Sequence, residues 1–475
     1  MTGPEPIDAA PAALDGKAGV FGRLFATPEF FRLWLAQVFS AFGDWVGFLA
    51  IIVIAERIGG DTAGSAIALV MIARVLPGFF LASVGGVIVD RFNRKRLMIT
   101  CDITRAVVLL VLPAIDTVWG LVLASLVLEL ATSLWGPAKE AIVPNVVPED
   151  QLTTANSLSL VAAYGTFPFA SAAFAGLART SDWLVGTGRL DLLDVNREAL
   201  ALYVDAATFL VAASLIATLP LVARSAAERR SSKRTIDWSS GVRELKEGWK
   251  FIALNPTVRA VLVALSTGMI GGGMLIPLGS VFNHQILEAD DDGYGAILTV
   301  LGVGVAVGVA ILSAIQTRVD KRRMFVGVII ASGVSLFFAV SVSAIQVSLV
   351  GVFALGLNAG AVYVLGFTLL HESVSDELRG RVFSALYTLV RFCLLVAIGV
   401  GGFLSEALDW VFEQTLESRV EIGSFGFDLV GVRGALWLAG LLIIGAGLLA
   451  AWSLRGGTPS GQNLDRAESP ATPNR

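Results

Sequence analysis

The stretch GGVIVDRFNRKR (85–96) separates two long apolar runs and decides how the whole chain is interpreted. An almost entirely apolar segment precedes it, and LMITCDITRAVVLLVL (97–112) follows it. A helix of a soluble protein needs only one apolar stripe, whereas a run that is apolar on every side predicts a helix that crosses a bilayer. We therefore interpret 85–96 as the end of one membrane span, a short basic loop and the start of the next span.

The composition is typical of a membrane protein. Of 475 residues, 55% are hydrophobic and only 16% are charged, whereas soluble domains carry roughly a quarter charged residues. The two cysteines, Cys101 and Cys393, lie inside apolar runs and support neither a disulfide framework nor a metal site. No G-x-x-x-x-G-K-[ST] phosphate loop occurs. The polar loops are short and poor in His, Cys and paired acids, so we expect no enzymatic activity, no metal, no cofactor and no nucleic-acid partner.

Twelve segments are long and apolar enough to span a bilayer. They predict an all-α integral membrane protein with twelve transmembrane helices. The predicted spans are 31–55, 63–89, 96–115, 117–138, 154–178, 200–222, 257–282, 294–316, 323–345, 346–370, 381–406 and 431–454.

Positive charge is concentrated in alternate connections between these spans. Lys and Arg cluster at 91–96, 224–250 and 318–323, whereas the connections on the other side carry the acids of LEADDDG (287–293) and EQTLESRVE (413–421). By the positive-inside rule, the basic loops and both ends of the chain face the cytoplasm. Arg far outnumbers Lys, which is typical of a GC-rich bacterium, so we expect a multi-pass protein of a bacterial inner (plasma) membrane.

The chain divides into two halves whose sequences resemble each other. VVPEDQLTTANSL (146–158) is similar to SVSDELRGRVFSAL (373–386), and DRFNRKRLM (90–98) is similar to TRVDKRRMF (317–325). Two parallel six-helix repeats related by an axis along the membrane normal are typical of one class of transporters. The predicted organisation is a flexible cytoplasmic tail (1–28), a six-helix half (29–222), a cytoplasmic linker with an amphipathic helix (223–256), a second six-helix half (257–455) and a flexible cytoplasmic tail (456–475).

The chain resembles the major facilitator superfamily over nearly its whole length. The superfamily signature between spans 2 and 3, G-x-x-x-D-R-x-x-R-K, is matched by Gly86, Asp90, Arg91, Arg94 and Lys95. FGDW (42–45), DITRA (102–106) and ELRGRVFS (377–384) resemble the branch that holds macrolide-efflux proteins and the enterobactin exporter. The resemblance implies alternating access through a central cavity lined by spans 1, 4, 7 and 10.

One departure from the family pattern concerns span 5. Proton antiporters of this superfamily often carry Gly-Pro-x-x-Gly-Gly there. In YGTFPFASAAFAG (164–176), Pro168 is kept, but Phe167 replaces the first glycine and Ala170 and Ser171 replace the last two. This motif therefore does not establish antiport.

Ionisable residues inside the spans are costly, so they are either paired with one another or functional. A structural interpretation pairs Asp44 with Arg74, and Glu129 with Arg105 or Arg391. Asp205 is expected near the outer surface and solvated. The candidate charge partners within the membrane are Arg74, Asp102, Arg105 and Arg391, of which Asp102 lies one turn from Arg105 on the same helix face.

A functional interpretation assigns proton coupling or substrate binding to Asp44 and Glu129. Each of these acids lies in a polar stripe at helical spacing, which is the pattern of a helix with one polar face. The cavity-lining candidates are Gln37, Ser40, Ser125 and Ser133, with Asn358 and Tyr363 as weaker candidates in span 10.

The sequence favours a proton-coupled exporter of amphipathic small molecules, of the multidrug or macrolide-efflux type. The alternatives of the same fold are a siderophore exporter, which would need a basic cavity, and a lysophospholipid transporter. A non-transporting receptor or membrane enzyme is disfavoured because no extra soluble domain or catalytic cluster is present. We expect a monomer that contacts the lipid bilayer, its substrate and protons. Asp90 is predicted to hold the cytoplasmic side closed by facing the start of span 11 near Gly380 and Arg381.

Overall fold

The computed structural model describes residues 24–148, 151–186, 198–220, 254–315, 318–374, 376–415, 419–422 and 425–455. Almost all of the predicted linker and the predicted tail at 456–475 lie outside these ranges, as does most of the tail at 1–28. In the described part, eleven segments are long and apolar enough to cross a membrane, and the first of them, Pro28–Gly78, includes the first helix and the first half of the second. Each of the twelve predicted spans therefore coincides with a helix, or with a pair of helices in span 5. The protein is an all-α membrane protein.

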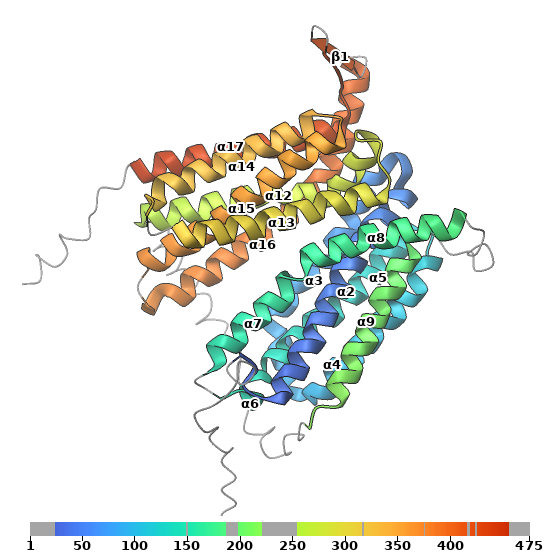
Figure 1. Cartoon of the computed structure of the whole chain (residues 1–475), viewed down its shortest axis with the longest axis vertical. Coiled ribbons are helices and arrows are strands. Elements are labelled where there is room, and N and C mark those ends of the chain that lie inside the picture. The colour runs from blue at the N-terminus through green and yellow to red at the C-terminus, as the bar shows by residue number, and fades with distance from the viewer. Residues whose placement is uncertain are drawn as a thin grey trace, which may run out of the picture.

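The helices up to residue 217 form a first group (Figure 1). Two short 3-10 turns, Gly60–Thr62 and Leu112–Ala114, follow the first and third helices. The helices of the first group are α2 (Pro28–Gly59), α3 (Ala63–Arg91), α4 (Arg94–Val111), α5 (Val118–Glu140), α6 (Val143–Val146), α7 (Leu152–Tyr164), α8 (Phe167–Gly186) and α9 (Ala199–Ala217).

The helices from residue 256 onward form a second group. A small antiparallel hairpin, β1 (Arg419–Ile422) and β2 (Phe425–Asp428), lies between its last two helices. Only an acidic connection was expected there, although apolar residues alternate in RVEIGSFGFD, a pattern typical of short strands. The helices of the second group are α12 (Pro256–Gln285), α13 (Asp291–Ile315), α14 (Lys321–Ser341), α15 (Ile345–Ser373), α16 (Asp376–Thr415) and α17 (Gly431–Arg455).

Polar residues just before the apolar runs fix where helices begin. The side chains of Thr27, Asn93, Thr117, Asn255 and Asp320 each accept a hydrogen bond from a backbone N–H in the first turn of the helix that follows. Such caps satisfy donors that have no partner within the helix. The local sequence therefore determines where these helices start.

The fifth predicted span is broken into α7 and α8. Pro168 is the second residue of α8, and it has no N–H to donate to the carbonyl group of Tyr164, the last residue of α7. The interruption falls in the YGTFPFASAAFAG stretch. The Pro168 ring also contacts the second group, because a Cβ on Gly302 of α13 would lie 2.8 Å from its Cγ.

Glycines allow α13 and α15 to touch through their backbones. A Cβ on Gly308 would lie 2.0 Å from the carbonyl oxygen of Leu357, and one on Gly356 would lie 2.2 Å from that of Leu301. Such distances are far below van der Waals contact, so no larger residue fits without movement of a helix. The glycine-rich stretch at 293–308 therefore packs closely against α15.

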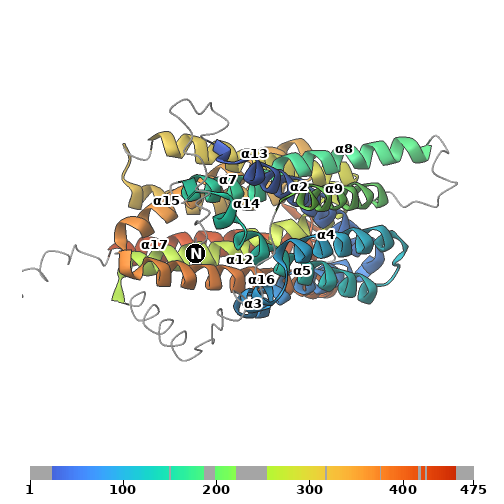
Figure 2. The same cartoon turned by 90° about the horizontal axis from the view of Figure 1, so that it is seen from below.

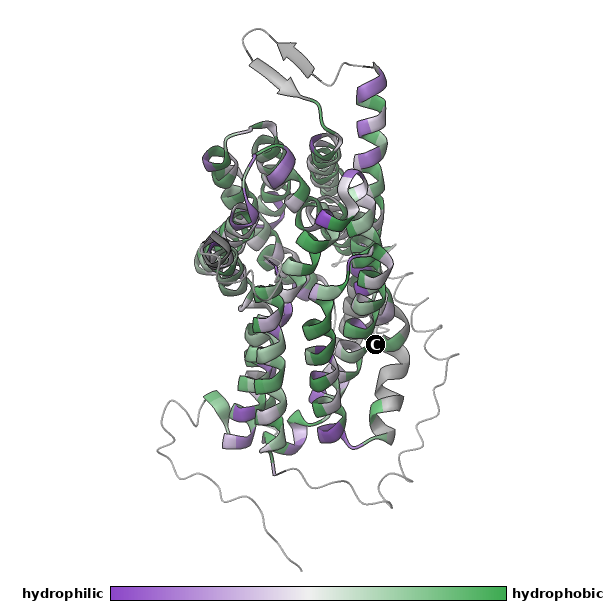
Figure 3. Cartoon of the chain, turned by 90° about the vertical axis from the view of Figure 1, so that its right-hand side faces the viewer, coloured by the Kyte–Doolittle hydropathy of each residue, from purple (hydrophilic) through white to green (hydrophobic). Residues whose placement is uncertain are grey.

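The two groups meet closely at one end of the molecule and spread apart toward the other (Figure 1). In the view from below, α15 and α17 lie on one side and α4, α5 and α9 on the other (Figure 2). One cluster of buried apolar side chains extends through both groups. Hydrophobic residues dominate the middle of the helices, and hydrophilic residues gather toward their ends, as expected for helices that cross a bilayer (Figure 3).

Candidate functional site

Charged side chains from several helices meet inside the first group. Asp44 of α2 lies between two guanidinium groups: its Oδ1 is 3.9 Å from Nη2 of Arg74 on α3, and its Oδ2 accepts a hydrogen bond of 3.2 Å from Nη1 of Arg105 on α4. The Asp44 side chain is 29% exposed, whereas that of Arg105 is 1% exposed. The pairing of Asp44 with Arg74 was expected from the sequence, and the contribution of Arg105 was not.

Arg105 is held mainly by Asp102, one turn away on α4. The two side chains form a buried ion pair, and Nε1–H of Trp135 on α5 donates to Oδ2 of Asp102 at 3.2 Å. The guanidinium also stacks over the ring of Phe209 on α9, with 4.0 Å between its Cζ atom and the ring centroid. Arg105 therefore bridges a fixed, fully buried acid and the more accessible Asp44.

Glu129 of α5 lies beside the same cations without a direct ion pair among the described residues. Its Oε1 accepts a hydrogen bond of 3.3 Å from the hydroxyl of Ser133, and Arg74 is its strongest favourable electrostatic neighbour. The expected pairing with Arg105 or Arg391 is wrong for this structure. Arg105 is already engaged on its own helix, and Arg391 lies on α16 of the second group with an exposed side chain.

Asp205 is the residue whose environment the sequence analysis misjudged. Instead of being solvated, it is 2% exposed and packs against two glycines of α2. A Cβ on Gly43 would lie 2.3 Å from Oδ1 of Asp205, and one on Gly47 would lie 2.0 Å from its Oδ2. The Thr208 hydroxyl is 3.5 Å from Oδ1. Hydropathy could not reveal this burial, because the room for the carboxyl group is provided by glycines on a distant helix.

The cluster holds more acids than cations. Four carboxyl groups share the two guanidinium groups of Arg74 and Arg105, and each of the other three acids interacts electrostatically with Asp44 and with at least one of the two arginines. If every group were ionised, two negative charges would be uncompensated in a membrane interior, which is energetically unfavourable. The cluster therefore has room for protons or for a cationic group of a substrate. Its acids are Asp44, Asp102, Glu129 and Asp205.

A second polar contact lies nearer the start of α2. Nε2–H of Gln37 donates to the carbonyl oxygen of Ser159 on α7 at 2.9 Å, and Nζ of Lys139 on α5 donates to Oε1 of Gln37 at 3.4 Å. Lys139 is buried and also contacts Glu140 at 2.7 Å. The sequence analysis missed Lys139 because the predicted fourth span ended one residue before it.

The remaining cavity-lining candidates differ in exposure. Ser40 and Ser125 are buried, and Ser133 is partly buried. On α15, the side-chain amide of Asn358 donates to the carbonyl oxygen one turn earlier, at 2.7 Å, and Tyr363 is 55% exposed. Their assignment to a cavity stays a prediction.

The basic loop between α3 and α4 contacts two helix ends of the first group. Nη1 of Arg94 donates to the carbonyl oxygen of Ala141 at the end of α5, and Nζ of Lys95 donates to that of Leu219 just after α9, at 2.8 and 2.6 Å. Cations stabilise helix C-termini because the helix dipole is negative there. The side chains of Gly86, Asp90 and Arg91 lie outside the described part, as do those of Gly380 and Arg381, so the predicted Asp90 contact stays a prediction.

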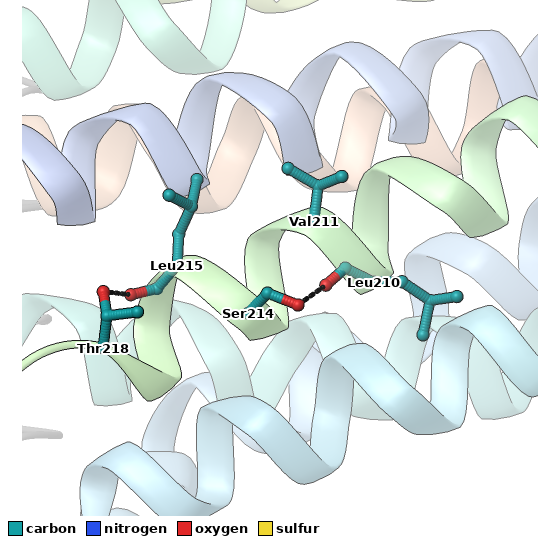
Figure 4. Close-up of a pocket in the computed structure, with 5 residues that line it drawn as sticks. All are labelled: Leu210, Val211, Ser214, Leu215 and Thr218. Carbon is teal, nitrogen blue, oxygen red and sulfur yellow. Dashed lines mark hydrogen bonds between the residues drawn. The ribbon is translucent and has the colours of Figure 1, made fainter.

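Outside the charged cluster, the described residues form no metal-binding group and one shallow apolar pocket is seen. No group of three or more His, Cys, Asp or Glu in them is arranged to hold a metal ion. A shallow apolar pocket of about 350 Å³ lies on α9 (Figure 4). Its two hydroxyl groups, from Ser214 and Thr218, each donate to a backbone carbonyl of the same helix at 2.7 Å. The pocket therefore presents no free polar group, and the charged cluster is the better candidate site.

Comparison with known proteins agrees with the membrane fold. Residues 23–168 match a family described as transmembrane secretion effectors, and residues 261–474 match the Major Facilitator Superfamily. The chain is 24% identical over 384 residues to the putative bacilysin exporter BacE of Bacillus subtilis, covering 79% of this chain and 88% of that protein. It is 30% identical over 132 residues to macrolide efflux protein A of Streptococcus pyogenes, covering 26% of this chain and 32% of that protein.

A solved structure shares the fold. A bacterial homologue of the human lysosomal transporter Spinster, in an inward-facing and occupied conformation, superposes with a TM-score of 0.67. The two chains are 14% identical, and the match covers 94% of this chain and 100% of that one. With family matches in both halves and relatives that are transporters, the chain belongs to the Major Facilitator Superfamily.

Proposed function

We propose that this transporter exports amphipathic small molecules in exchange for protons. The observation that carries the proposal is the excess of carboxyl groups over guanidinium groups around Asp44, in a site built from α2, α3, α4, α5 and α9. Names of relatives support the direction of transport, since a putative bacilysin exporter and a macrolide efflux protein are among them. An acidic site favours cationic cargo and disfavours the anionic siderophores considered from the sequence.

The coupling follows from the geometry of Asp44. While it is ionised, Asp44 attracts both Arg74 and Arg105, which draws α2, α3 and α4 together. A proton on Asp44 weakens both contacts and releases Arg74 toward Glu129, its electrostatic neighbour on α5. Arg105 stays with Asp102 in either case. Proton binding is thereby linked to the relative position of helices, which is what coupling requires.

The proposal also includes the orientation of the chain in the membrane and its division into two halves. The basic loops and both chain ends are assigned to the cytoplasm, which puts the end where the two groups spread apart on that side. The two groups are taken as halves that move relative to each other, with boundaries at 29–222 and 257–455. The protein is taken to act as a monomer in a bacterial cell membrane.

The experiment uses purified protein in proteoliposomes and the fluorescent cation ethidium as the probe. An imposed pH gradient should drive ethidium transport in the wild type, and Asp44→Asn and Glu129→Gln should each reduce it by more than about tenfold. Asp116→Asn, which changes an exposed acid in a loop, is the matched control. Equal ethidium flux with and without the gradient would contradict proton coupling. Full activity of both variants would contradict the site.

A further inference from the structure

Where the two groups of helices meet, a histidine lies between two carboxylates from different helices. Nδ1 of His284 on α12 is 2.9 Å from Oε1 of Glu56 on α2, and Nε2 of His284 is 3.1 Å from Oδ1 of Asp291 on α13. The other carboxylate oxygen of Glu56 accepts a hydrogen bond from the hydroxyl of Ser280, one turn before His284. Among the residues that the structure describes, Glu56 is the one first-group member of this cluster, and the imidazole joins it to the second group.

Hydrogen-bond accounting determines which form of His284 fits. A neutral imidazole has one N–H donor and one acceptor nitrogen, whereas an imidazolium has two donors. Both ring nitrogens face carboxylate oxygens, so the neutral ring would place a lone pair against one of them. With both carboxylates ionised, only the imidazolium satisfies both contacts at once. The His284 side chain is 32% exposed, so a proton can reach it from water.

No other cation competes for these acids among the described residues. Arg57, next to Glu56 on α2, pairs with Glu198 at 3.2 Å, and Arg179 of α8 pairs with Asp292 of α13 at 2.8 Å. Tyr294 of α13, an electrostatic neighbour of Glu56, donates its hydroxyl to a backbone carbonyl at 2.7 Å. Among the described residues, the cation that faces both Glu56 and Asp291 is therefore the protonated ring of His284.

The cluster lies among other contacts that join the two groups at the same end. Oε1 of Glu406 on α16 accepts a hydrogen bond of 2.7 Å from the backbone N–H of Ser65 on α3. Close by, α3 and α16 approach through their backbones, because a Cβ on Gly402 would lie 2.0 Å from the carbonyl oxygen of Gly64. Opening this end must break the Glu56–His284 contact together with these.

We propose that Glu56, His284 and Asp291 form a proton-binding site that locks the two groups of helices together at this end. Binding of one proton from water to the imidazole supplies the second donor and closes the contact. Loss of that proton returns it to water and leaves one carboxylate facing a lone pair, which favours opening. The site is separate from the Asp44 cluster, and its action requires no cargo. Only its placement on the outer face of the membrane rests on the proposed orientation.

The test measures the opening of this end directly, in the full-length protein in lipid nanodiscs without substrate or gradient. Spin labels are attached at Thr62→Cys, between α2 and α3, and Gln346→Cys, in the first turn of α15, both exposed. Cys101 and Cys393 are replaced by alanine in this background. Distances between the labels are then measured from about pH 6 to about pH 9, which starts near the titration of a free histidine.

The short distance should dominate at low pH, and the ratio of closed to open molecules should fall by up to about tenfold per pH unit as the pH rises. His284→Gln, which cannot become cationic, should abolish this dependence and favour the open form at every pH. His371→Gln, which changes the other histidine of the chain, is the control and should behave as the wild type.

Two results would overturn the proposal. One is a distance distribution of the wild type that does not change with pH, and the other is a pH dependence that persists in His284→Gln. Glu56→Gln provides a second variant, in case His284→Gln is poorly folded, and should weaken the closed form in the same direction. Because no transport is measured, failure of proton-coupled export would leave these outcomes unaffected.

Discussion

The helices within the first group and the helices within the second group are held together by different kinds of interaction. The interior of the first group contains Asp44, Asp102, Glu129 and Asp205 around two arginines, and its helices are joined by ion pairs and hydrogen bonds. The second group packs α13 against α15 through glycines that leave no space for a side chain. Its buried arginine, Arg433, donates to the carbonyl oxygen of Val340 near the end of α14.

This difference indicates a division of roles between groups of the same topology. Electrostatic contacts change when a proton or a cation binds, so a helix bundle held by them can adopt more than one arrangement. Backbone contact between glycine-bearing helices has one good geometry and moves as a unit. The first group is thus suited to sensing protons, and the second to moving rigidly against it.

The largest effect is expected where a buried charge loses its partner. Arg105→Met should lower the free energy of unfolding by about 3–5 kcal/mol, because it leaves Asp102 ionised and unpaired in the interior of the first group. The double variant Asp102→Asn/Arg105→Met removes both charges and should recover most of that loss. Chemical denaturation in detergent micelles measures both. If Arg105→Met is as stable as the wild type, ion pairs do not hold the helices of the first group together.

In the second group, we expect the loss of stability to come from a steric clash. Gly308→Ala places a methyl group 2.0 Å from the carbonyl oxygen of Leu357, so it should destabilise the protein by about 1–3 kcal/mol at any salt concentration or pH. Gly268→Ala on α12 is the matched control, since a Cβ there meets nothing within 4 Å, and it should be neutral or stabilising by up to about 1 kcal/mol. Equal stability of the two variants would show that α13 and α15 can separate freely.

The sequence was sufficient for the helices, although not for the short β1–β2 hairpin. Apolar runs located the spans, and the spacing of Asp102 and Arg105 placed them on one face of α4. It did not reveal contacts between helices distant in the chain. Arg105 could not be assigned to Asp44 in preference to Glu129, because both pairs cross between helices and charge alone does not distinguish them.

The same limit explains what was missed at the joined end of the molecule. In the sequence, His284 is simply a polar residue between two apolar runs. Its role depends on Glu56, which is more than two hundred residues away in the sequence. Asp205 was misjudged for a similar reason, since only the position of α2 shows where the carboxyl group fits.

Asp205 provides a smaller and sharper test of the first group. Asp205→Asn keeps the size and shape of the side chain between Gly43 and Gly47, so it should change the free energy of unfolding by less than about 1 kcal/mol. Asp205→Leu cannot keep that shape and should cost about 1–3 kcal/mol. If Asp205→Asn is as damaging as Asp205→Leu, the negative charge rather than the fit between the helices is what stabilises α9 against α2.

The smallest effects return to the basic loops, where the two groups again differ. Lys95 donates to a carbonyl oxygen at the end of α9, whereas Lys321 in the matching loop of the second group pairs with Glu372 on α15. Lys95→Ala should therefore cost about 0.3–1 kcal/mol through the lost helix-end contact. Arg96→Ala, an exposed neighbour, should stay within about 0.5 kcal/mol. The melting temperatures of these two variants and of Lys321→Ala show whether the loop cations stabilise the fold or only set the orientation of the chain in the membrane. If all three match the wild type, the cations of GGVIVDRFNRKR fix the orientation of the chain and add nothing to the stability of the first group.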